Sequence, residues 1–172
     1  MAWRFSSWEV SSPGKPRRTG EVGISRQASR LQGFMSTFGD FNRDLVADMR
    51  AHKGKATSGP FVGRDVLILT TKGAKSGETR VTPIVYSRDG DRYVIVASKG
   101  GAPTNPHWFH NLMAHPHVSV EVDGEKFAAH ARIVDEREYE RLYEHHATKN
   151  PTFHDYRKKT TRKIPVVLLE RV

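Results

Sequence analysis

Short apolar, β-branched runs separated by turn signals fill the sequence from residue 66 onward, and this succession limits the fold more than any other feature. The runs occupy residues 66–71 (VLILTT), 79–86, 93–97 (YVIVA), 118–122 (VSVEV), 126–134 and 164–170. Turns are indicated by RDGD at 88–91 and by Asp123-Gly124, because Asp-Gly pairs adopt the positive φ angles of tight hairpins. Successive hairpins without crossover helices predict an antiparallel sheet that closes into a small barrel.

Two segments before and within this series have helical signals. Apolar residues recur at helical spacing from Phe38 to Met49, which predicts an amphipathic helix that ends near His52. Asn105 followed by Pro106 is typical of an N-cap and a first-turn proline, and predicts a short helix over PHWFHNLMA.

A third helix is predicted before the last strand. Asp135 and Glu138 have the spacing of a capping box, and the helical pattern continues to about Lys149. Its predicted inner face consists of Tyr139, Leu142, Tyr143 and His146. The sequence therefore predicts a mostly-β or α+β domain, with about six strands in an antiparallel barrel and about three helices.

The first 34 residues differ in composition from the rest. They carry six basic and two acidic residues, so +4 of the net charge of +9 lies there, and SSPGKPRRTGEVG favours loop or disorder. We expect residues 1–34 to be a disordered basic leader or a non-native N-terminal extension, with a transit peptide as a further alternative. A chain of 172 residues suits one domain, which we expect to span residues 35–172.

Composition also excludes several classes of protein. Cysteine is absent, which rules out disulfides, cysteine nucleophiles and thiolate metal sites. No run reaches the roughly 18 apolar residues of a membrane span, and the N-terminus lacks the apolar core of a secretory signal. We therefore expect a cytoplasmic protein. Two alternatives stay open for the 38–52 helix, which follows the basic leader. It lies on the anionic inner face of the plasma membrane, or it packs on the barrel.

The first candidate site is the turn TTKGAKSGETR at residues 70–80. Backbone N–H groups of such a turn can bind an anion while Lys72, Lys75 and Arg80 supply positive charge. The spacing does not match the P-loop pattern GxxxxGK[ST], and no helix follows it. The alternative is a solvated basic hairpin without a ligand.

The second candidate site is ASKGGAPTNPHWFHN at residues 97–111. Its two glycines permit close approach of a ligand to the backbone, and the following helix start offers unpaired donors. Trp108 and Phe109 could cover an aromatic ring, although Trp108 in the core of a plain strand-to-helix connection is the alternative. Two anion-friendly turns, each after a strand, favour one joint site over two separate ones.

Other chemistries have weaker support. The crowded His107, His110, His115 and His117 lack an HExxH pattern and carboxylates at ligand spacing, so we predict no metal. No GxSxG motif supports a hydrolase, and a Ser98–Lys99 pair on one strand would point to opposite faces. Aromatic residues are not interleaved with the basic cluster, so nucleic acid is not expected as a partner.

Three motifs resemble the deazaflavin-dependent nitroreductase and quinone reductase family. They are LTTKGAKSGETRVTPIVY, VIVASKGGAPTNPHWFHNLMAHPHV and NPTFHDYRKKTTRKIPVVLLE, which follow the family's order between residues 66 and 170. The middle motif is the most specific, because SKGG is followed by NPxWxxN at a fixed spacing. The resemblance implies a split β-barrel of the FMN-binding-like superfamily and coenzyme F420 as cofactor, a deazaflavin with a phosphate and an oligoglutamate tail.

The resemblance also implies roles for individual positions. The basic turn would hold the phosphate and tail, the strand 81–85 and segment 96–99 would meet the ring, and residues 107–111 would complete the pocket. The implied cofactor residues are Ala74, Lys75, Ser76, Gly77, Arg80, Val81, Thr82, Pro83, Ile84, Val85, Val96, Ala97, Ser98, Lys99, His107, Trp108, Phe109, His110, Asn111 and Phe153. Ser98 and Tyr156 are the implied catalytic residues, Ser98 near the ring and Tyr156 at the acceptor.

The sequence departs from the nitroimidazole-activating members of the family. Ala74 stands where these have an arginine, and Val85 and Phe153 stand where they have tyrosines. We therefore expect hydride transfer from reduced coenzyme F420 to a small electron-poor acceptor, namely a quinone, an activated enone or a nitroaromatic compound. The alternatives are an FMN-dependent reductase of the same superfamily and a non-catalytic deazaflavin carrier or basic interaction protein.

Overall fold

The structure of the chain is a computed structural model that describes residues 39–172. The predictions for the leader 1–34, for a domain start near Met35 and for a helix start at Phe38 lie outside the described residues. All of the described residues belong to one compact unit.

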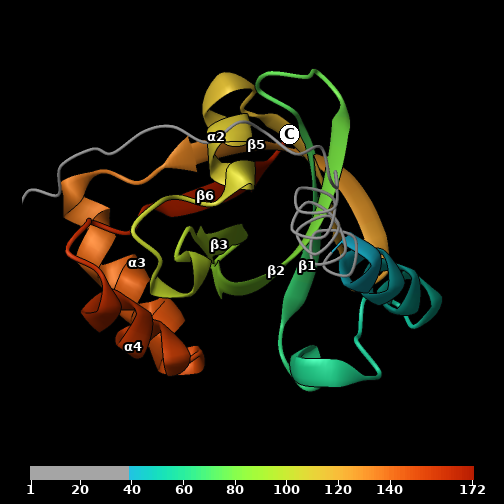
Figure 1. The fold of residues 1–172 in the computed structure, drawn as a ribbon, viewed down its shortest axis with the longest axis horizontal. Coiled ribbons are helices and arrows are strands. Elements are labelled where there is room, and N and C mark those ends of the chain that lie inside the picture. The colour runs from blue at the N-terminus through green and yellow to red at the C-terminus, as the bar shows by residue number, and fades with distance from the viewer. Residues whose placement is uncertain (1–38) are drawn as a thin grey trace, which may run out of the picture. The chain divides into compact units, whose positions relative to one another are not determined.

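Six antiparallel strands close into a barrel in the order β1-β2-β3-β6-β5-β4 (Figure 1). The strands are β1 (Val66–Lys72), β2 (Thr79–Asp89), β3 (Arg92–Val96), β4 (His117–Val122), β5 (Glu125–Ile133) and β6 (Val166–Arg171). Every neighbouring pair is antiparallel, including the β1–β4 pair that closes the barrel. The predicted barrel and its six strands are confirmed.

The hairpin between β4 and β5 follows from its sequence. Asp123 and Gly124 have φ angles of 52° and 82°, the positive values that a two-residue hairpin turn of this kind requires. This turn fixes the register in which Val122 pairs with Glu125 and Val120 with Phe127. Since a shift by one residue would turn every apolar side chain to the other face, the turn also fixes which residues enter the barrel.

Consecutive residues of the apolar strands pack into two different cores. Leu67 and Leu69 belong to a cluster that includes residues of all six strands and is completed by helix α2 (His107–Ala114). Val66 and Ile68 belong to a second cluster between the barrel and helices α3 (Glu136–Lys149), α4 (Thr152–Lys159) and 39–51. Side chains of a strand alternate between its faces, so burial of both faces explains why these runs are apolar without a break.

The helices agree with the predictions except in number. The 39–51 helix buries Leu45, Val46 and Met49 against the barrel, as one of the two alternatives for it proposed. The capping of α3 is confirmed, since the Asp135 side chain accepts hydrogen bonds from the backbone N–H groups of Arg137 and Glu138. None of the helices within residues 39–172 is long and apolar enough to span a membrane.

Helix α4 was not predicted, so the described part of the chain has four helices where about three were expected. Only Phe153 of its eight residues is buried, and its last turn is entirely basic (Arg157, Lys158, Lys159). A helix this short and polar has no apolar stripe that sequence periodicity could detect. Two short 3-10 segments, η1 (Gly59–Phe61) and η2 (Lys99–Gly101), complete the fold.

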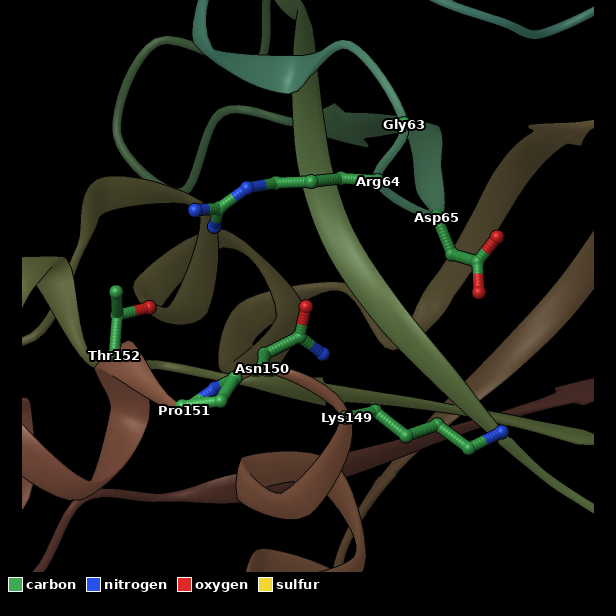
Figure 2. Close-up of a pocket in the computed structure, with 7 residues that line it drawn as sticks. All are labelled: Gly63, Arg64, Asp65, Lys149, Asn150, Pro151 and Thr152. Atoms are coloured by element: carbon green, nitrogen blue, oxygen red, sulfur yellow. The ribbon is translucent and has the colours of Figure 1, made fainter.

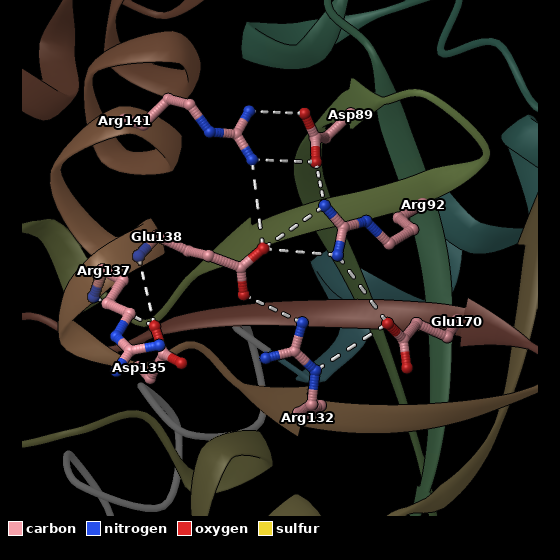
Figure 3. Close-up of polar contacts among 8 residues, drawn as sticks. All are labelled: Asp89, Arg92, Arg132, Asp135, Arg137, Glu138, Arg141 and Glu170. Carbon is pink, nitrogen blue, oxygen red and sulfur yellow. Dashed lines mark hydrogen bonds and ion pairs between the residues drawn. The ribbon is translucent and has the colours of Figure 1, made fainter.

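An ion-pair network joins α3 to the outer surface of the barrel (Figure 3). Arg141 Nη1 lies 2.7 Å from an oxygen of Asp89, and Arg132 Nη2 lies 3.0 Å from Glu138 Oε2. Arg92 pairs with both Asp89 and Glu138. The hydrogen bond from Arg141, together with that from Arg92, lowers the pKa of Asp89 to about 2. Several charges share this network, which makes it more effective than an isolated surface pair.

Candidate functional site

A cleft of about 400 Å³ lies beside β2 and the end of β3, and its walls also come from η1, η2, α2 and α4. Nine of the predicted site residues line it: Pro83, Ile84, Val85, Val96, Ser98, Lys99, Trp108, Phe153 and Tyr156. These residues come from four separate segments of the sequence, so the fold brings together the strand, turn and helix positions that the motifs indicated.

The strands supply an apolar wall. Pro83 and Val85 are buried on one face of β2, and Val96 is buried at the end of β3. Val85 and Val96 belong to the second core cluster, between the barrel and the helices. The wall of the cleft is therefore continuous with packed protein and cannot move freely. Trp108, half-buried at the start of α2, adds an aromatic surface.

The polar end of the cleft is the turn after β3, here called the second glycine turn (residues 98–102). β3 ends at Val96, so the expectation that Ser98 and Lys99 continue the strand is wrong: Ser98 has helical backbone angles, and Lys99 has a φ of 48°. Both residues therefore line the cleft instead of facing opposite sides of a sheet. The Ser98 hydroxyl makes no hydrogen bond with another residue of the described part, and it remains available to a ligand.

Arg162 holds the second glycine turn in place. Its guanidinium donates hydrogen bonds to three backbone carbonyls, those of Ala97 (3.1 Å), Ser98 (3.0 Å) and Ala102 (2.9 Å). A fourth bond of 2.6 Å goes to Asn105 Oδ1. The prediction that Asn105 caps α2 is therefore wrong, because its side chain is engaged by Arg162 and Pro106 occupies the N-cap position.

Helix α4 positions the predicted acceptor-side residues. The Tyr143 hydroxyl of α3 donates a 2.8 Å hydrogen bond to the Phe153 carbonyl, and the rings of Phe153 and Tyr156 meet edge to face at 5.2 Å. A Cβ on Gly101 would lie 2.9 Å from the Tyr156 carbonyl oxygen, so only glycine lets α4 approach the second glycine turn this closely. The Tyr156 hydroxyl forms no hydrogen bond with another described residue.

The first glycine turn (residues 72–80) joins the end of β1 to the start of β2. Two backbone hydrogen bonds close it, from Gly73 N–H to the Glu78 carbonyl at 2.7 Å and from Gly77 N–H to the Gly73 carbonyl at 2.9 Å. Asn111 of α2 accepts a 3.0 Å bond from Ala74 N–H and donates a 3.1 Å bond to Thr71 Oγ1. Asn111 is buried, so this amide fastens the turn to the barrel.

The cations of the first glycine turn are exposed. Lys72 and Lys75 have no ion pair or hydrogen bond with another described residue, whereas Arg80 pairs with Glu78 at 2.7 Å. Arg80 precedes Pro83 of the cleft by three residues, about 10 Å along an extended strand. A ligand with a ring in the cleft and an acidic tail can therefore reach this turn along β2.

The remaining predicted residues do not line the cleft. Ala97 and Phe109 are buried in the barrel core, and His107 and His110 are exposed on α2. The others, on the first glycine turn and along β2 and α2, are Ala74, Lys75, Ser76, Gly77, Arg80, Val81, Thr82 and Asn111. Within residues 39–172, no histidine, aspartate or glutamate cluster is arranged to hold a metal ion.

Sequence reasoning missed three lining residues, Pro60, Phe61 and Arg64, and the arginine that holds the turn. The three lining residues lie in or beside η1, in a loop without a motif. Gly100 and Pro106, which also line the cleft, lie in the second candidate site. Arg162 lies within the third motif, in the stretch KKTTRK, where nothing distinguishes it from its basic neighbours. No local sequence signal could have identified it, because its partners lie 57 to 65 positions away.

A family model described as F420H(2)-dependent quinone reductase matches residues 41–171. The chain belongs to this family. Membership confirms the resemblance to deazaflavin-dependent reductases that the three motifs indicated, and it covers the barrel, the cleft and both glycine turns.

Individual relatives agree with the family assignment. An F420H(2)-dependent quinone reductase of Mycobacterium tuberculosis is 44% identical over 108 residues, which are 61% of this chain and 72% of the relative. A solved F420-H2 dependent reductase, FDR-A, has a TM-score of 0.58 and 36% identity, and covers 62% of this chain and 95% of its own. A solved chain described as a domain-swapped dimer has a TM-score of 0.60 and 33% identity, with 77% and 98% coverage.

The residues of the cleft fit a deazaflavin cofactor of the kind that the family name implies. The flat apolar wall of Pro83, Val85 and Val96 suits an aromatic tricycle, and the Ser98 hydroxyl can meet a polar ring atom. Gly100 lines the cleft with φ +64°. Apart from its two chain neighbours, no described residue has an atom within 4 Å of its Cβ position, so its backbone is open to a ring. Lys75 is an exposed cation, which suits an acidic tail.

Proposed function

We propose that this chain binds coenzyme F420 in the cleft and reduces an electron-poor acceptor of the quinone class. The observation that carries the proposal is the arrangement of an apolar ring-sized wall, two unpaired hydroxyl groups and an exposed cationic turn along β2, in a member of this family. When bound, the reduced deazaflavin supplies the hydride, while the protein supplies binding and orientation.

Binding of the tail is assigned to the first glycine turn. Lys75 is free of ion pairs within the described residues, so its full charge is available to a phosphate or carboxylate. Arg80 first has to leave Glu78, at 2.7 Å, before it can bind the tail with its full charge. Ala74 presents a backbone N–H that is already donated to Asn111 and is therefore not a free tail contact.

Orientation of the reacting groups is assigned to the other end of the cleft. The Ser98 hydroxyl would hydrogen-bond the ring, and the Tyr156 hydroxyl would hold the acceptor's carbonyl oxygen or give it a proton. Alignment of a donor and an acceptor in one site can contribute up to roughly 7–11 kcal/mol in favourable model systems. The rigid β2–β3 wall and the packing of α4 on Gly101 serve this alignment.

Titration with coenzyme F420 and with FMN tests the cofactor assignment. We expect saturable binding of coenzyme F420 and weaker binding of FMN, which carries a phosphate but no acidic tail for the cations of the first glycine turn. Binding of FMN alone would favour the FMN-dependent alternative, and binding of neither would overturn the proposal. Oxidation of reduced coenzyme F420 by menadione then distinguishes a reductase from a carrier.

The role of Tyr156 has its own test. Tyr156→Phe keeps the ring contact with Phe153 and removes only the hydroxyl. A proton-donating role predicts a fall in kcat of roughly 100-fold or more, the usual range for a general acid. Turnover that stays intact assigns the proton to solvent and leaves the cofactor assignment standing.

Peripheral membrane contact remains a prediction. The 39–51 helix uses Leu45, Val46 and Met49 for packing and leaves Phe41 41% exposed. One exposed aromatic residue is a small apolar surface for binding a bilayer. Sedimentation with anionic vesicles, with the full chain and with a chain that begins at Met35, would separate a role of the leader from a role of this helix.

A further inference from the structure

A second pocket, of about 230 Å³, lies beyond the cleft and shares Arg64 with it (Figure 2). It lies between the end of the η1 loop and the junction of α3 with α4. Its lining residues are Gly63, Arg64, Asp65, Lys149, Asn150, Pro151 and Thr152. None of these was predicted as a site residue, and none belongs to the apolar wall formed by Pro83, Val85 and Val96.

The Arg64 guanidinium has no charged partner in the described part of the chain. It forms no hydrogen bond, ion pair or ring contact with another described residue, whereas Arg92, Arg141 and Arg157 each bind carboxylates. Its neighbour Asp65 points to the other end of the pocket, away from the guanidinium (Figure 2). An unpaired guanidinium on a pocket wall presents its donors in the fork geometry that matches a carboxylate.

Thr152 gives an independent indication of a ligand. Its Oγ1 is buried and has no hydrogen-bond partner among residues 39–172, a condition that few polar groups of a folded protein show. Thr152 and Arg64 line the same pocket, and a hydroxyl and a guanidinium are both hydrogen-bond donors. Asn150 also lines the pocket, and its amide nitrogen is already donated to the His146 carbonyl at 3.2 Å.

The charges of the pocket favour an anion. Arg64 and Lys149 carry positive charge and Asp65 carries negative charge, so the lining has a net charge of +1. Arg64 reaches the cleft as well, at the side where η1 faces Phe153 and Tyr156. An anion held in this pocket therefore lies beside α4, next to the place assigned to the acceptor.

We propose that this pocket is an acceptor subsite that binds a carboxylate substituent of the acceptor, through Arg64 and the Thr152 hydroxyl. The proposal rests on the proposed function of the cleft, because the acceptor ring is taken to lie beside Tyr156. It extends that function by naming a substrate class: electron-poor rings that carry a short acidic side chain. A neutral quinone would leave the subsite filled with water.

A binding comparison tests the proposal without turnover. The protein is loaded with oxidised coenzyme F420, so no hydride can be transferred, and is titrated with menadione and with a naphthoquinone that carries a short carboxyalkyl chain. The readout is the ratio of the two dissociation constants. Wild type is compared with Arg64→Met, Thr152→Val and the control Arg137→Met, which removes an exposed arginine twelve residues before Lys149, about 18 Å along α3.

The expected result is a preference of about tenfold for the carboxylated quinone in wild type, as expected for one charge-assisted contact at a partly exposed site. Arg64→Met should bring the ratio close to one, Arg137→Met should leave it unchanged, and raised salt should reduce it. A ratio near one in wild type, or a preference that survives in Arg64→Met, overturns the proposal. Failure to load coenzyme F420 instead overturns the proposed function, and the same titration of cofactor-free protein still reports the ratio.

Thr152→Val distinguishes a ligand-binding role of the hydroxyl from a structural role, because the two roles change Tm in opposite directions. A buried hydroxyl that has a hydrogen-bond partner only when a ligand is bound destabilises the ligand-free protein. Its removal should therefore raise Tm by about 2–4 °C, and it should also reduce the preference for the carboxylated quinone. A lower Tm with an unchanged ratio would mean that the hydroxyl serves the fold, and would remove Thr152 from the subsite.

Discussion

The two glycine turns beside the cleft are fastened to the barrel by different means. The first turn closes on itself through two backbone hydrogen bonds and is attached by one neutral amide, that of Asn111. The second turn is held by one cation, the guanidinium of Arg162, which donates three hydrogen bonds to backbone carbonyls and a fourth to the Asn105 side chain. The Asn111 amide adds no charge to the first turn, whereas four bonds to one guanidinium hold the second turn in place.

This difference matches what each turn has to present. Lys72 and Lys75 stay exposed and unpaired within the described part of the chain, which suits capture of a flexible anionic tail. In the proposed function, the second turn places Ser98 and the backbone of Gly100 against a ring, and four bonds to one planar group fix the turn for this. Arg162 thus acts as a positioning residue for the cleft without lining it.

Replacement of Arg162 by Met should have the largest effect. It leaves the carbonyls of Ala97, Ser98 and Ala102 without their donor, and we expect a loss of roughly 3 kcal/mol in the free energy of unfolding, since each unsatisfied group contributes about 1 kcal/mol or more. Denaturant unfolding measures this loss. Binding of coenzyme F420 should weaken as well, because the turn no longer holds Ser98 in place.

Two further variants define the origin of that effect. Arg162→Lys keeps the charge and loses the planar fork, so it should recover little of the stability. Lys163→Met removes the next positive charge, which is exposed and pairs with Glu136, and should change the free energy of unfolding by less than about 1 kcal/mol. Equal losses in Arg162→Met and Lys163→Met would mean that the two turns are not fastened differently.

Acid should lower the free energy of unfolding through His146. The groups that hold the two turns, the Asn111 amide and the Arg162 guanidinium, keep their charge state in mild acid. His146 is fully buried beside Phe153, and burial, followed by the charge of His145, lowers its pKa from 6.5 to about 4. The unfolded chain therefore takes up this proton at a higher pH than the folded chain. Stability is complete above pH 6.5 and falls as the pH drops from 6.5 towards 4, by roughly 2 kcal/mol at pH 5.

Unfolding in denaturant at pH 8 and pH 5 measures this difference. His146→Gln keeps a polar partner for Ser87, which contacts His146 Nδ1 at 3.0 Å, and does not titrate. The variant should lose most of the difference between the two pH values. If it retains the wild-type difference, the acid-sensitive group lies elsewhere and the assignment to His146 is wrong.

Replacement of Asn111 by Leu should have a smaller effect than loss of Arg162. The Thr71 hydroxyl loses its buried donor, whereas the exposed Ala74 N–H can bind water, so we expect a loss of roughly 1.5 kcal/mol in the free energy of unfolding. The backbone amides of residues 73–78 should exchange hydrogen faster. Thr71→Val removes only the other hydrogen bond, and should lower stability without faster exchange in the turn.

Most of the fold could be predicted because its strands carry their own signals. The Asp123-Gly124 hairpin, the two-sided apolar run of β1 and the Asp135 cap are local patterns, each tied to one physical requirement. Helix α4 could not be predicted, since one buried residue, Phe153, gives no period. Its position depends on tertiary contacts, among them the Tyr143 hydrogen bond and the close approach to Gly101.

The site was predictable in part for the same reason. Residues that touch the cleft from strands and glycine turns stand in recognisable motifs, whereas Arg162 and Arg64 act through space from loops with ordinary sequence. The motifs also named Phe109 and Ala97, which the structure places in the barrel core. A motif marks a segment that is near a ligand, and only the fold decides which of its side chains faces the cleft.

The smallest expected effect distinguishes two cations of the first glycine turn. Lys75→Ala should raise the Kd for coenzyme F420 by about three- to fivefold, as expected for one exposed charge pair. Arg80→Ala should raise it less, because Glu78 already binds the Arg80 guanidinium at 2.7 Å and competes with the tail. Glu78→Gln removes that competitor and should tighten binding in wild type but not in the Arg80→Ala background. If Arg80→Ala weakens binding more than Lys75→Ala, the tail displaces Glu78 from Arg80, and the larger role assigned to Lys75 is wrong.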